Sequence, residues 1–98
     1  MKISEMEANA QEASKLLKSL ANPNRLMVLC HLSKGECTVG ELEKLIGLSQ
    51  SALSQHLARL REEDIVECRR EAQSMFYSVK DEKTKQLLSS LYELYCDA

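Results

Sequence analysis

The sequence has little material for long loops, since it contains only three glycines and one proline in 98 residues. It has no apolar run near the roughly 18 residues that a membrane-spanning helix needs. The N-terminal segment MKISEMEANAQEASK also lacks the apolar centre of a secretory signal peptide. We therefore expect a single domain over residues 1–98, located in the cytoplasm and without contact with a membrane.

The sequence also lacks an excess of positive charge, with 13 Lys and Arg against 15 Asp and Glu and a formal net charge of −2. This balance counts against nucleic-acid binding, because affinity for DNA rests largely on neutralised phosphates. It does not exclude DNA binding, since a dimer can keep acidic residues on one face and basic residues on another. Specificity would then depend on polar side chains more than on a broad basic surface.

Two helices are expected in the first third of the sequence. The first runs over about residues 4–20, and one apolar stripe at helical spacing is formed by Met6, Ala10, Ala13, Leu17 and Leu20. The second covers residues 24–32, with Asn22 as its N-cap and Pro23 in its first turn. Because the second helix is apolar on almost all sides, we expect it to be central and buried.

The segment that follows carries the signals of a short helix, a glycine turn and a second helix. Thr38 and Glu41 have the spacing of a capping box, and Gly47 suits the end of a helix that runs through Ile46. Ser49 then caps the second helix. The narrow apolar face of that helix is formed by Leu53, Leu57 and Leu60. This order of elements is typical of a helix-turn-helix.

Residues 65–79 change to an alternating pattern, which predicts a β-hairpin with its tip at residues 71–73. Asp81 begins a last helix that extends to Asp97 and has a broad apolar face. The fold class is therefore mainly α with a β-hairpin wing, a winged helix-turn-helix in the order α-α-α-α-β-β-α. The two terminal helices offer apolar stripes for a homodimer interface, although both stripes could instead cover the core of the monomer.

The helix after Ser49 carries small polar side chains opposite its leucines. Glutamine can pair with adenine, serine with several bases, and arginine with guanine or phosphate. We predict base contacts from Ser51, Ser54 and Gln55, and mainly phosphate contacts from the arginines; an ordinary solvated face is the alternative. The predicted DNA-binding residues are Gln50, Ser51, Ser54, Gln55, Arg59, Arg69, Arg70 and Gln73.

Four cysteines in a chain without a secretory signal are core thiols, metal ligands or redox sensors rather than a static disulfide framework. Taken alone, Cys30 in an apolar helix is most simply a core thiol. A core role explains Cys96 less well, because Cys96 lies close to the end of the sequence, where chains are usually frayed. His31 and His56 are expected to be boundary residues and not metal ligands. With no Cys-x-x-Cys motif and no basic residue beside Cys96, we expect no enzymatic activity.

The sequence resembles the ArsR family of bacterial repressors in three motifs: LSQSALSQHL at 48–57, VGEL at 39–42 and NPNRL at 22–26. The resemblance implies a winged-helix homodimer that binds an operator, an imperfect palindrome in double-stranded DNA, and releases it on sensing an inducer. The family's arsenic and cadmium site has two cysteines flanking a valine, where this sequence has Thr38 and Gly40. Its zinc and nickel site needs a histidine in the last helix, which has none. We expect no metal and no cofactor.

The placement of Cys30 and Cys96 resembles the thiol- and persulfide-sensing branch of that family, the SqrR, BigR and HlyU proteins. The resemblance implies that these two cysteines form a redox-sensing pair that becomes bridged by a small sulfur or oxidant inducer. Cys37 and Cys68 are expected to be bystanders. Three alternatives stay open: a metal-responsive repressor that uses Cys30, His31 and Cys96, a thiol redox enzyme, or a dimeric interaction module that has lost DNA binding.

Overall fold

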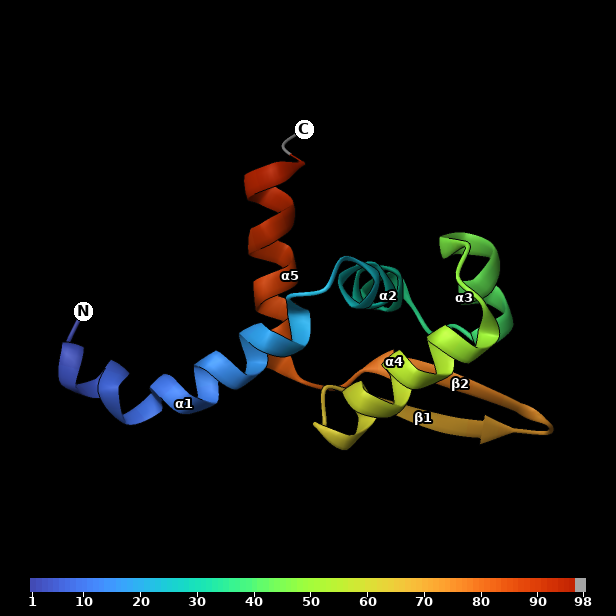
Figure 1. The fold of residues 1–98 in the computed structure, drawn as a ribbon, viewed down its shortest axis with the longest axis horizontal. Coiled ribbons are helices and arrows are strands. Elements are labelled where there is room, and N and C mark those ends of the chain that lie inside the picture. Colours follow the sequence, from blue (N-terminus) through green and yellow to red (C-terminus); the bar gives the residue numbers. More distant parts are fainter. Residues whose placement is uncertain (97–98) are drawn as a thin grey trace.

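The computed structural model describes residues 1–96, which form five helices and one antiparallel hairpin (Figure 1). The elements, in chain order, are α1 (Ile3–Leu20), α2 (Pro23–Lys34), α3 (Val39–Ile46), α4 (Gln50–Glu62), β1 (Val66–Glu71), β2 (Ser74–Val79) and α5 (Glu82–Tyr95). The predicted winged helix-turn-helix arrangement is therefore confirmed. The predicted end of the last helix, at Asp97, lies outside the described residues. No described helix is both long enough and apolar enough to cross a membrane.

Side-chain caps fix where two of the helices begin. The Oδ1 atom of Asn22 accepts hydrogen bonds from the backbone N–H groups of Asn24 and Arg25, both at 3.0 Å. The Oδ2 atom of Asp81 accepts from the N–H of Thr84 at 2.9 Å. These bonds satisfy donors that the first turn of a helix leaves without intrahelical partners. The helix starts predicted at Asn22 and Asp81 are therefore confirmed.

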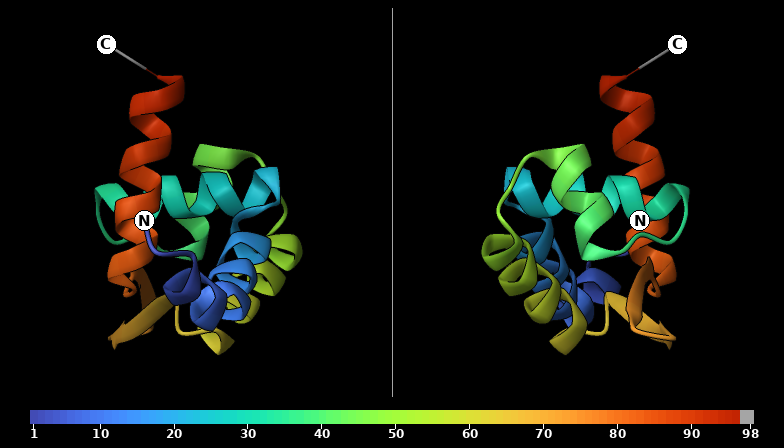
Figure 2. Two further views of the ribbon diagram at one scale, coloured as in Figure 1. Left: turned by 90° about the vertical axis from the view of Figure 1, so that its left-hand side faces the viewer. Right: turned by 90° about the vertical axis from the view of Figure 1, so that its right-hand side faces the viewer.

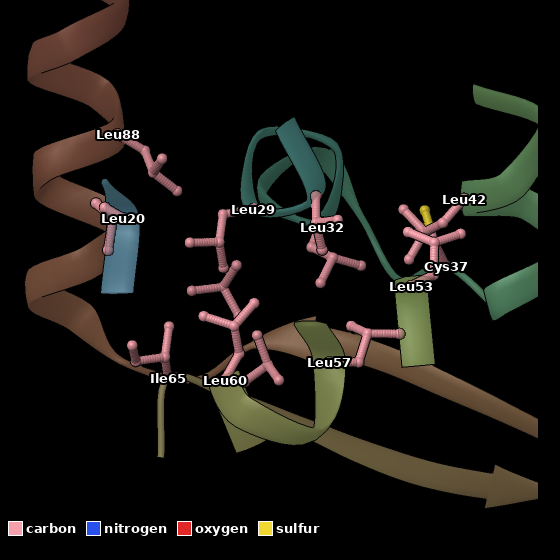
Figure 3. Packing of buried hydrophobic residues seen from close by; sticks show 13 residues of the cluster. Leu20, Leu29, Leu32, Cys37, Leu42, Leu53, Leu57, Leu60, Ile65 and Leu88 are labelled. Atoms are coloured by element: carbon pink, nitrogen blue, oxygen red, sulfur yellow. The ribbon is translucent and has the colours of Figure 1, made fainter. Parts of the chain in front are cut away.

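Helix α2 lies at the centre of the fold, packed against α1, α3, α5 and β2. Its Val28 and Leu29 side chains are fully buried, and Leu29 points into the cluster that leucines of α1, α4 and α5 complete (Figure 3). The prediction that α2 is buried on almost all sides is wrong at Met27, which is 45% exposed. Its side chain faces a cleft between α2 and α5 instead of another helix.

Arg25 is a buried charge that the sequence did not predict, with only 8% of its surface exposed. Its Nε donates to the carbonyl of Ser19 at 2.8 Å, and its second guanidinium nitrogen donates to the carbonyl of Lys18 at 3.3 Å. The last carbonyls of a helix have no intrahelical donors, so the guanidinium caps the C-terminus of α1. Arg25 thereby connects the first turn of α2 to the last turn of α1.

Helix α1 and the C-terminal part of α5 project from the rest of the chain, as Figures 1 and 2 show. The Cα radius of gyration is 14.5 Å, whereas a compact domain of this length has about 13 Å. Of the apolar stripe predicted on α1, only Leu20 is buried. The other four residues of the stripe are exposed: Met6, Ala10, Ala13 and Leu17. The monomer core therefore leaves most of this stripe uncovered.

Candidate DNA interface and thiol cleft

The helix-turn-helix is defined by local hydrogen bonds at the start of α3, at the end of α3 and at the start of α4. The Thr38 hydroxyl accepts from the Glu41 N–H at 3.2 Å, and the Glu41 carboxylate accepts from the Thr38 N–H at 2.9 Å. Gly47 ends α3 in the left-handed region, with φ of 87°, and its N–H donates to the Glu43 carbonyl at 2.8 Å. The Ser49 hydroxyl then caps α4. The predicted capping box, glycine turn and serine cap are all confirmed.

Helix α4 has one buried face and one exposed face. Leu53, Leu57 and Leu60 are at most 1% exposed and pack into the core (Figure 3). The exposed surface of α4 carries five of the predicted DNA-binding residues: Gln50, Ser51, Ser54, Gln55 and Arg59. Its first two turns carry amides and hydroxyls without a charged side chain. Such a surface offers donors and acceptors to base edges and little attraction to phosphates.

The wing is a two-stranded hairpin in which Arg69 pairs with Phe76, and Arg70 with Met75. The predicted tip at residues 71–73 is wrong by one residue, because Glu71 belongs to β1 and the turn contains only Ala72 and Gln73. Ala72 adopts a left-handed conformation with φ of 56°. A turn residue with positive φ is usually glycine or asparagine, so an alanine at this position gives no sequence signal for the turn.

The base of the wing is held by backbone bonds to the segment before α3. The N–H of Cys37 donates to the Tyr77 carbonyl at 3.1 Å, and the Tyr77 N–H donates to the Cys37 carbonyl at 2.8 Å. Tyr77 also pairs with Cys68 across the hairpin. The wing is therefore fixed to the start of the helix-turn-helix.

Arg69 is engaged by two carboxylates. It donates to the two Glu36 oxygens at 2.8 and 2.9 Å and to Glu71 at 2.7 Å, and its guanidinium lies 4.7 Å from the centre of the Phe76 ring. These hydrogen bonds raise the pKa of Arg69, and the bond to Arg69 lowers the pKa of Glu36. Glu36 was not predicted as a site residue, and its separation of 33 positions from Arg69 leaves no local signal.

A second polar cluster joins the C-terminus of α1 to α2 and α4. The Ser19 hydroxyl, which is buried, donates to the Glu63 carboxylate, and Arg59 forms an ion pair with the same carboxylate at 3.6 Å. Burial and the charges of Arg25 and Arg59 lower the pKa of the His56 imidazole. Helix α1 is therefore linked through polar contacts to the helix that carries the predicted base-reading face.

Cys30 and Cys96, far apart in the sequence, line the same cleft between α2 and α5. The cleft has a volume of about 660 Å³, and Tyr92 and Leu88 lie along its α5 wall, one and two turns before Cys96 respectively. Burial raises the pKa of the Cys30 thiol, and the neighbouring Cys96 raises it further. Cys96 itself is exposed. The fold thus brings together the two thiols that the sequence predicted as a pair.

The other two cysteines lie elsewhere. Cys37 is buried beneath the wing and Cys68 is half-buried in β1, and neither lines the cleft that contains Cys30. His31 shares the cleft with the predicted thiol pair. Within residues 1–96, no three His, Cys, Asp or Glu side chains are grouped to hold a metal ion.

Sequence comparison identifies proteins similar to this chain over its whole length. The family described as "Bacterial regulatory protein, arsR family" matches residues 22–67. The transcriptional activator HlyU of Vibrio cholerae is 48% identical over 98 residues, which cover 100% of this chain and 91% of that protein.

Structure comparison gives the same relationship. The transcriptional repressor BigR from Xylella fastidiosa matches with a TM-score of 0.94 and 46% identity, over 100% of both chains. The structure described as reduced HlyU from Vibrio cholerae matches with a TM-score of 0.89 and 48% identity, over 95% of this chain and 98% of that one. The sequence and the overall fold therefore agree with the same group of proteins.

Proposed function

The chain belongs to the ArsR family of bacterial regulatory proteins, and we propose that it is a cytoplasmic, homodimeric repressor whose operator binding is switched by bridging Cys30 and Cys96. Its relatives are transcriptional regulators with the same winged fold, so the chain is a DNA-binding transcriptional regulator and not an enzyme. The resemblance inferred from the sequence motifs is thereby confirmed. HlyU is described as an activator and BigR as a repressor. We infer repression because BigR, with a TM-score of 0.94 against 0.89 for HlyU, matches this fold more closely.

In the proposed complex, α4 enters the major groove and the wing lies along the backbone. Its exposed amides and hydroxyls, from Ser51, Ser54 and Gln55, read the bases. Arg59 at the end of α4 and Arg70 on the wing contact phosphates. Gln50 and Gln73, at the start of α4 and at the tip of the wing, lie at the edges of this surface.

The proposed homodimer uses the apolar surface that the monomer leaves exposed on its two terminal helices. This surface comprises Met6 and Leu17 on α1 and Leu94 and Tyr95 on α5, which are between 48% and 83% exposed. Large exposed apolar patches are costly in water and mark interfaces. A twofold dimer on this surface would present two α4 helices to half-sites about 34–36 Å apart, so we expect the operator to be palindromic.

The observation that carries the proposed switch is the shared cleft of Cys30 and Cys96. Joining two thiols as a disulfide removes two electrons and two protons, which a persulfide or an oxidant must accept. A relative was studied in a form described as reduced, which agrees with a thiol pair that has two states. The bridge would fasten α5, part of the proposed dimer interface, to the central helix α2. Fastening α5 would change the angle between the two α4 helices of the dimer. A coupling free energy of only about 1–3 kcal/mol between bridge formation and DNA binding would then be enough to release the operator.

The test measures operator affinity by fluorescence anisotropy, before and after treatment with a persulfide, alongside intact-mass analysis of the same samples. The wild-type protein should lose affinity as its mass shows a bridge. Cys30→Ser and Cys96→Ser should each bind the operator as the reduced wild type does and stay bound after treatment. Cys37→Ser and Cys68→Ser are matched controls, and both should still release. If Cys96→Ser releases normally, the paired-thiol switch is wrong.

A further inference from the structure

Three helices meet at Ser19, the penultimate residue of α1. Its backbone carbonyl accepts a hydrogen bond from the Nε of Arg25, at the start of α2, at 2.8 Å. Its hydroxyl belongs to a fully buried side chain and donates to the carboxylate of Glu63, the residue that ends α4. Ser19 therefore joins α1 to α2 through its main chain and to α4 through its side chain.

Glu63 lies where the chain leaves the proposed base-reading helix. Its backbone N–H donates to the Arg59 carbonyl at 3.2 Å, and Asp64 then turns the chain through a left-handed conformation with φ of 59°. The carboxylate of Glu63, whose side chain is 21% exposed, accepts from the Ser19 hydroxyl and lies 3.6 Å from the Nε of Arg59. The end of α4 is thereby attached both to its own preceding turn and to α1.

Polar contacts, more than close apolar packing, hold these two segments together. A cavity of about 100 Å³ lies between α1 and residues 63–65, and Leu16 and Ile65 line it together with Ser19 and Glu63. Burial and the charge of Arg59 lower the pKa of the Arg25 guanidinium, and the charge of Glu63 opposes this decrease. Because a hydrogen bond to a charged group is stronger than one between neutral groups, the bond to Glu63 is the main restraint at this junction.

The junction lies between the two surfaces that the proposed function uses. Helix α1 carries part of the proposed dimer surface, and α4 carries the proposed base-reading face. Two α4 helices of a twofold dimer can enter successive major grooves only if their separation matches that of the half-sites. One base pair more or less moves a half-site by about 3.4 Å and rotates it by about a tenth of a turn. The position of α4 relative to α1 therefore decides which half-site spacing fits.

We propose that the hydrogen bond between Ser19 and Glu63 determines the half-site spacing that the dimer accepts. The bond makes each α4 a rigid extension of α1, so the dimer discriminates among operators by spacing as well as by sequence. Both are positioning residues, since Ser19 is fully buried and the carboxylate of Glu63 is turned toward α1. The inference rests on the proposed homodimer and its operator, and it adds a specificity determinant that contacts no base.

The test uses duplexes built from the half-sites that the wild-type protein selects from randomised DNA. The spacing between the half-sites is shortened or lengthened by one and two base pairs, and fluorescence anisotropy gives the affinity for each duplex. The wild type should lose about tenfold in affinity when the spacing changes by two base pairs. Glu63→Ala and Ser19→Ala should each lose only about twofold. The double variant should resemble the single ones, because all three lack the same bond.

The spacing penalty is a ratio measured within one protein, so a variant that folds incompletely does not distort it. Glu62→Ala is the matched control, because Glu62 is exposed, precedes Glu63 and carries the same charge. It should keep the penalty of the wild type. Glu63→Gln should keep most of it as well, since the amide oxygen can still accept from the Ser19 hydroxyl.

A penalty in both single alanine variants as large as in the wild type would overturn the inference while leaving the proposed function intact. Loss of the penalty in Glu63→Gln or Glu62→Ala would also overturn it, because the charge at the end of α4 and not the bond to Ser19 would then be responsible. A wild-type protein that binds every spacing equally would instead remove the proposed dimeric operator binding, and the inference with it.

Discussion

The guanidinium of Arg69 is held by both carboxylate oxygens of Glu36, with Nε 2.8 Å from one oxygen and a terminal nitrogen 2.9 Å from the other. Glu36 lies just before the segment that joins the wing to α3, so the pair connects β1 to the start of the helix-turn-helix. Glu71 binds the same guanidinium at 2.7 Å. Two carboxylates therefore offset the charge of an arginine that we predicted to contact DNA.

This arrangement distinguishes the two wing arginines. Arg70 donates to the Ala72 carbonyl at 3.3 Å and forms no ion pair within residues 1–96. Arg70→Ala should therefore weaken operator and random DNA alike and flatten the slope of log K against log salt by about one unit. Arg69→Ala should flatten the slope by clearly less, because its charge is already offset. Anisotropy titrations at several salt concentrations measure both slopes, and equal flattening would show that Arg69 leaves its carboxylates to bind phosphate.

Gln55→Ala tests base reading by α4. The Gln55 side chain is exposed on the face opposite the buried leucines, where a bidentate amide can pair with adenine. The variant should lose about 1–3 kcal/mol of binding free energy on the operator and much less on random DNA. Gln11→Ala, at an exposed glutamine of α1, should bind both DNAs as the wild type does. Equal losses by Gln55→Ala on the two DNAs would exclude a base-reading role.

Local signals in the sequence were enough to predict the helix starts and the helix-turn-helix. Thr38, Gly47 and Ser49 act on backbone groups within a few residues, so their effect can be recognised without the fold. The pairing of Cys30 with Cys96 was expected through resemblance to a family and not from spacing, and the structure shows that both line one cleft.

Features that depend on tertiary contacts could not be predicted in this way. Arg25 is buried because the C-terminus of α1 supplies carbonyls, and Glu36 meets Arg69 only once the wing has folded back. One signal for Arg25 was available, since it precedes Val28, Leu29 and Leu32 at helical spacing and shares their buried face. The charge at that position obscured the pattern.

Leu17→Asp tests the proposed dimer surface. Leu17 on α1 is 55% exposed in the single chain, and an aspartate there would place a charge in an apolar interface. The variant should sediment as a monomer at concentrations where the wild type is a dimer. Leu45→Asp is a close control, because Leu45 on α3 has the same exposed fraction and lies outside the terminal helices. A wild-type protein that sediments as a monomer would contradict the proposed homodimer.

His56→Gln tests, through the pH dependence of stability, whether the His56 imidazole on α4 is partly buried near Arg25 and Arg59. Burial and the charges of Arg25 and Arg59 lower the pKa of His56 in the folded state. The unfolded chain, with a histidine pKa of about 6.5, then binds more protons than the folded one, so stability should fall as the pH drops from about 7.5 to about 5.5. His56→Gln should lose less stability over this interval than the wild type. Urea unfolding at a fixed protein concentration measures this, and identical pH dependence in His56→Gln and the wild type would contradict the prediction.

The order in which the cysteines react can be predicted from their surroundings. Alkylation by iodoacetamide requires the thiolate, so a raised pKa or burial slows it near neutral pH. Burial raises the pKa of both Cys30 and Cys37, whereas Cys96 is exposed. Peptide mass mapping of a quenched time course should therefore find Cys96 labelled first and the buried Cys37 last.

The same experiment separates burial from the influence of the neighbouring thiol. In Cys96→Ser, Cys30 should be labelled faster than in the wild type, because the charge of Cys96 contributes to its raised pKa. Raising the pH should increase the Cys30 rate in both proteins, since more of the thiol ionises. Labelling of urea-unfolded protein is the control, and there the differences due to the fold should disappear. If Cys30 is labelled before Cys96 in the folded wild type, burial does not set the order in which these thiols react.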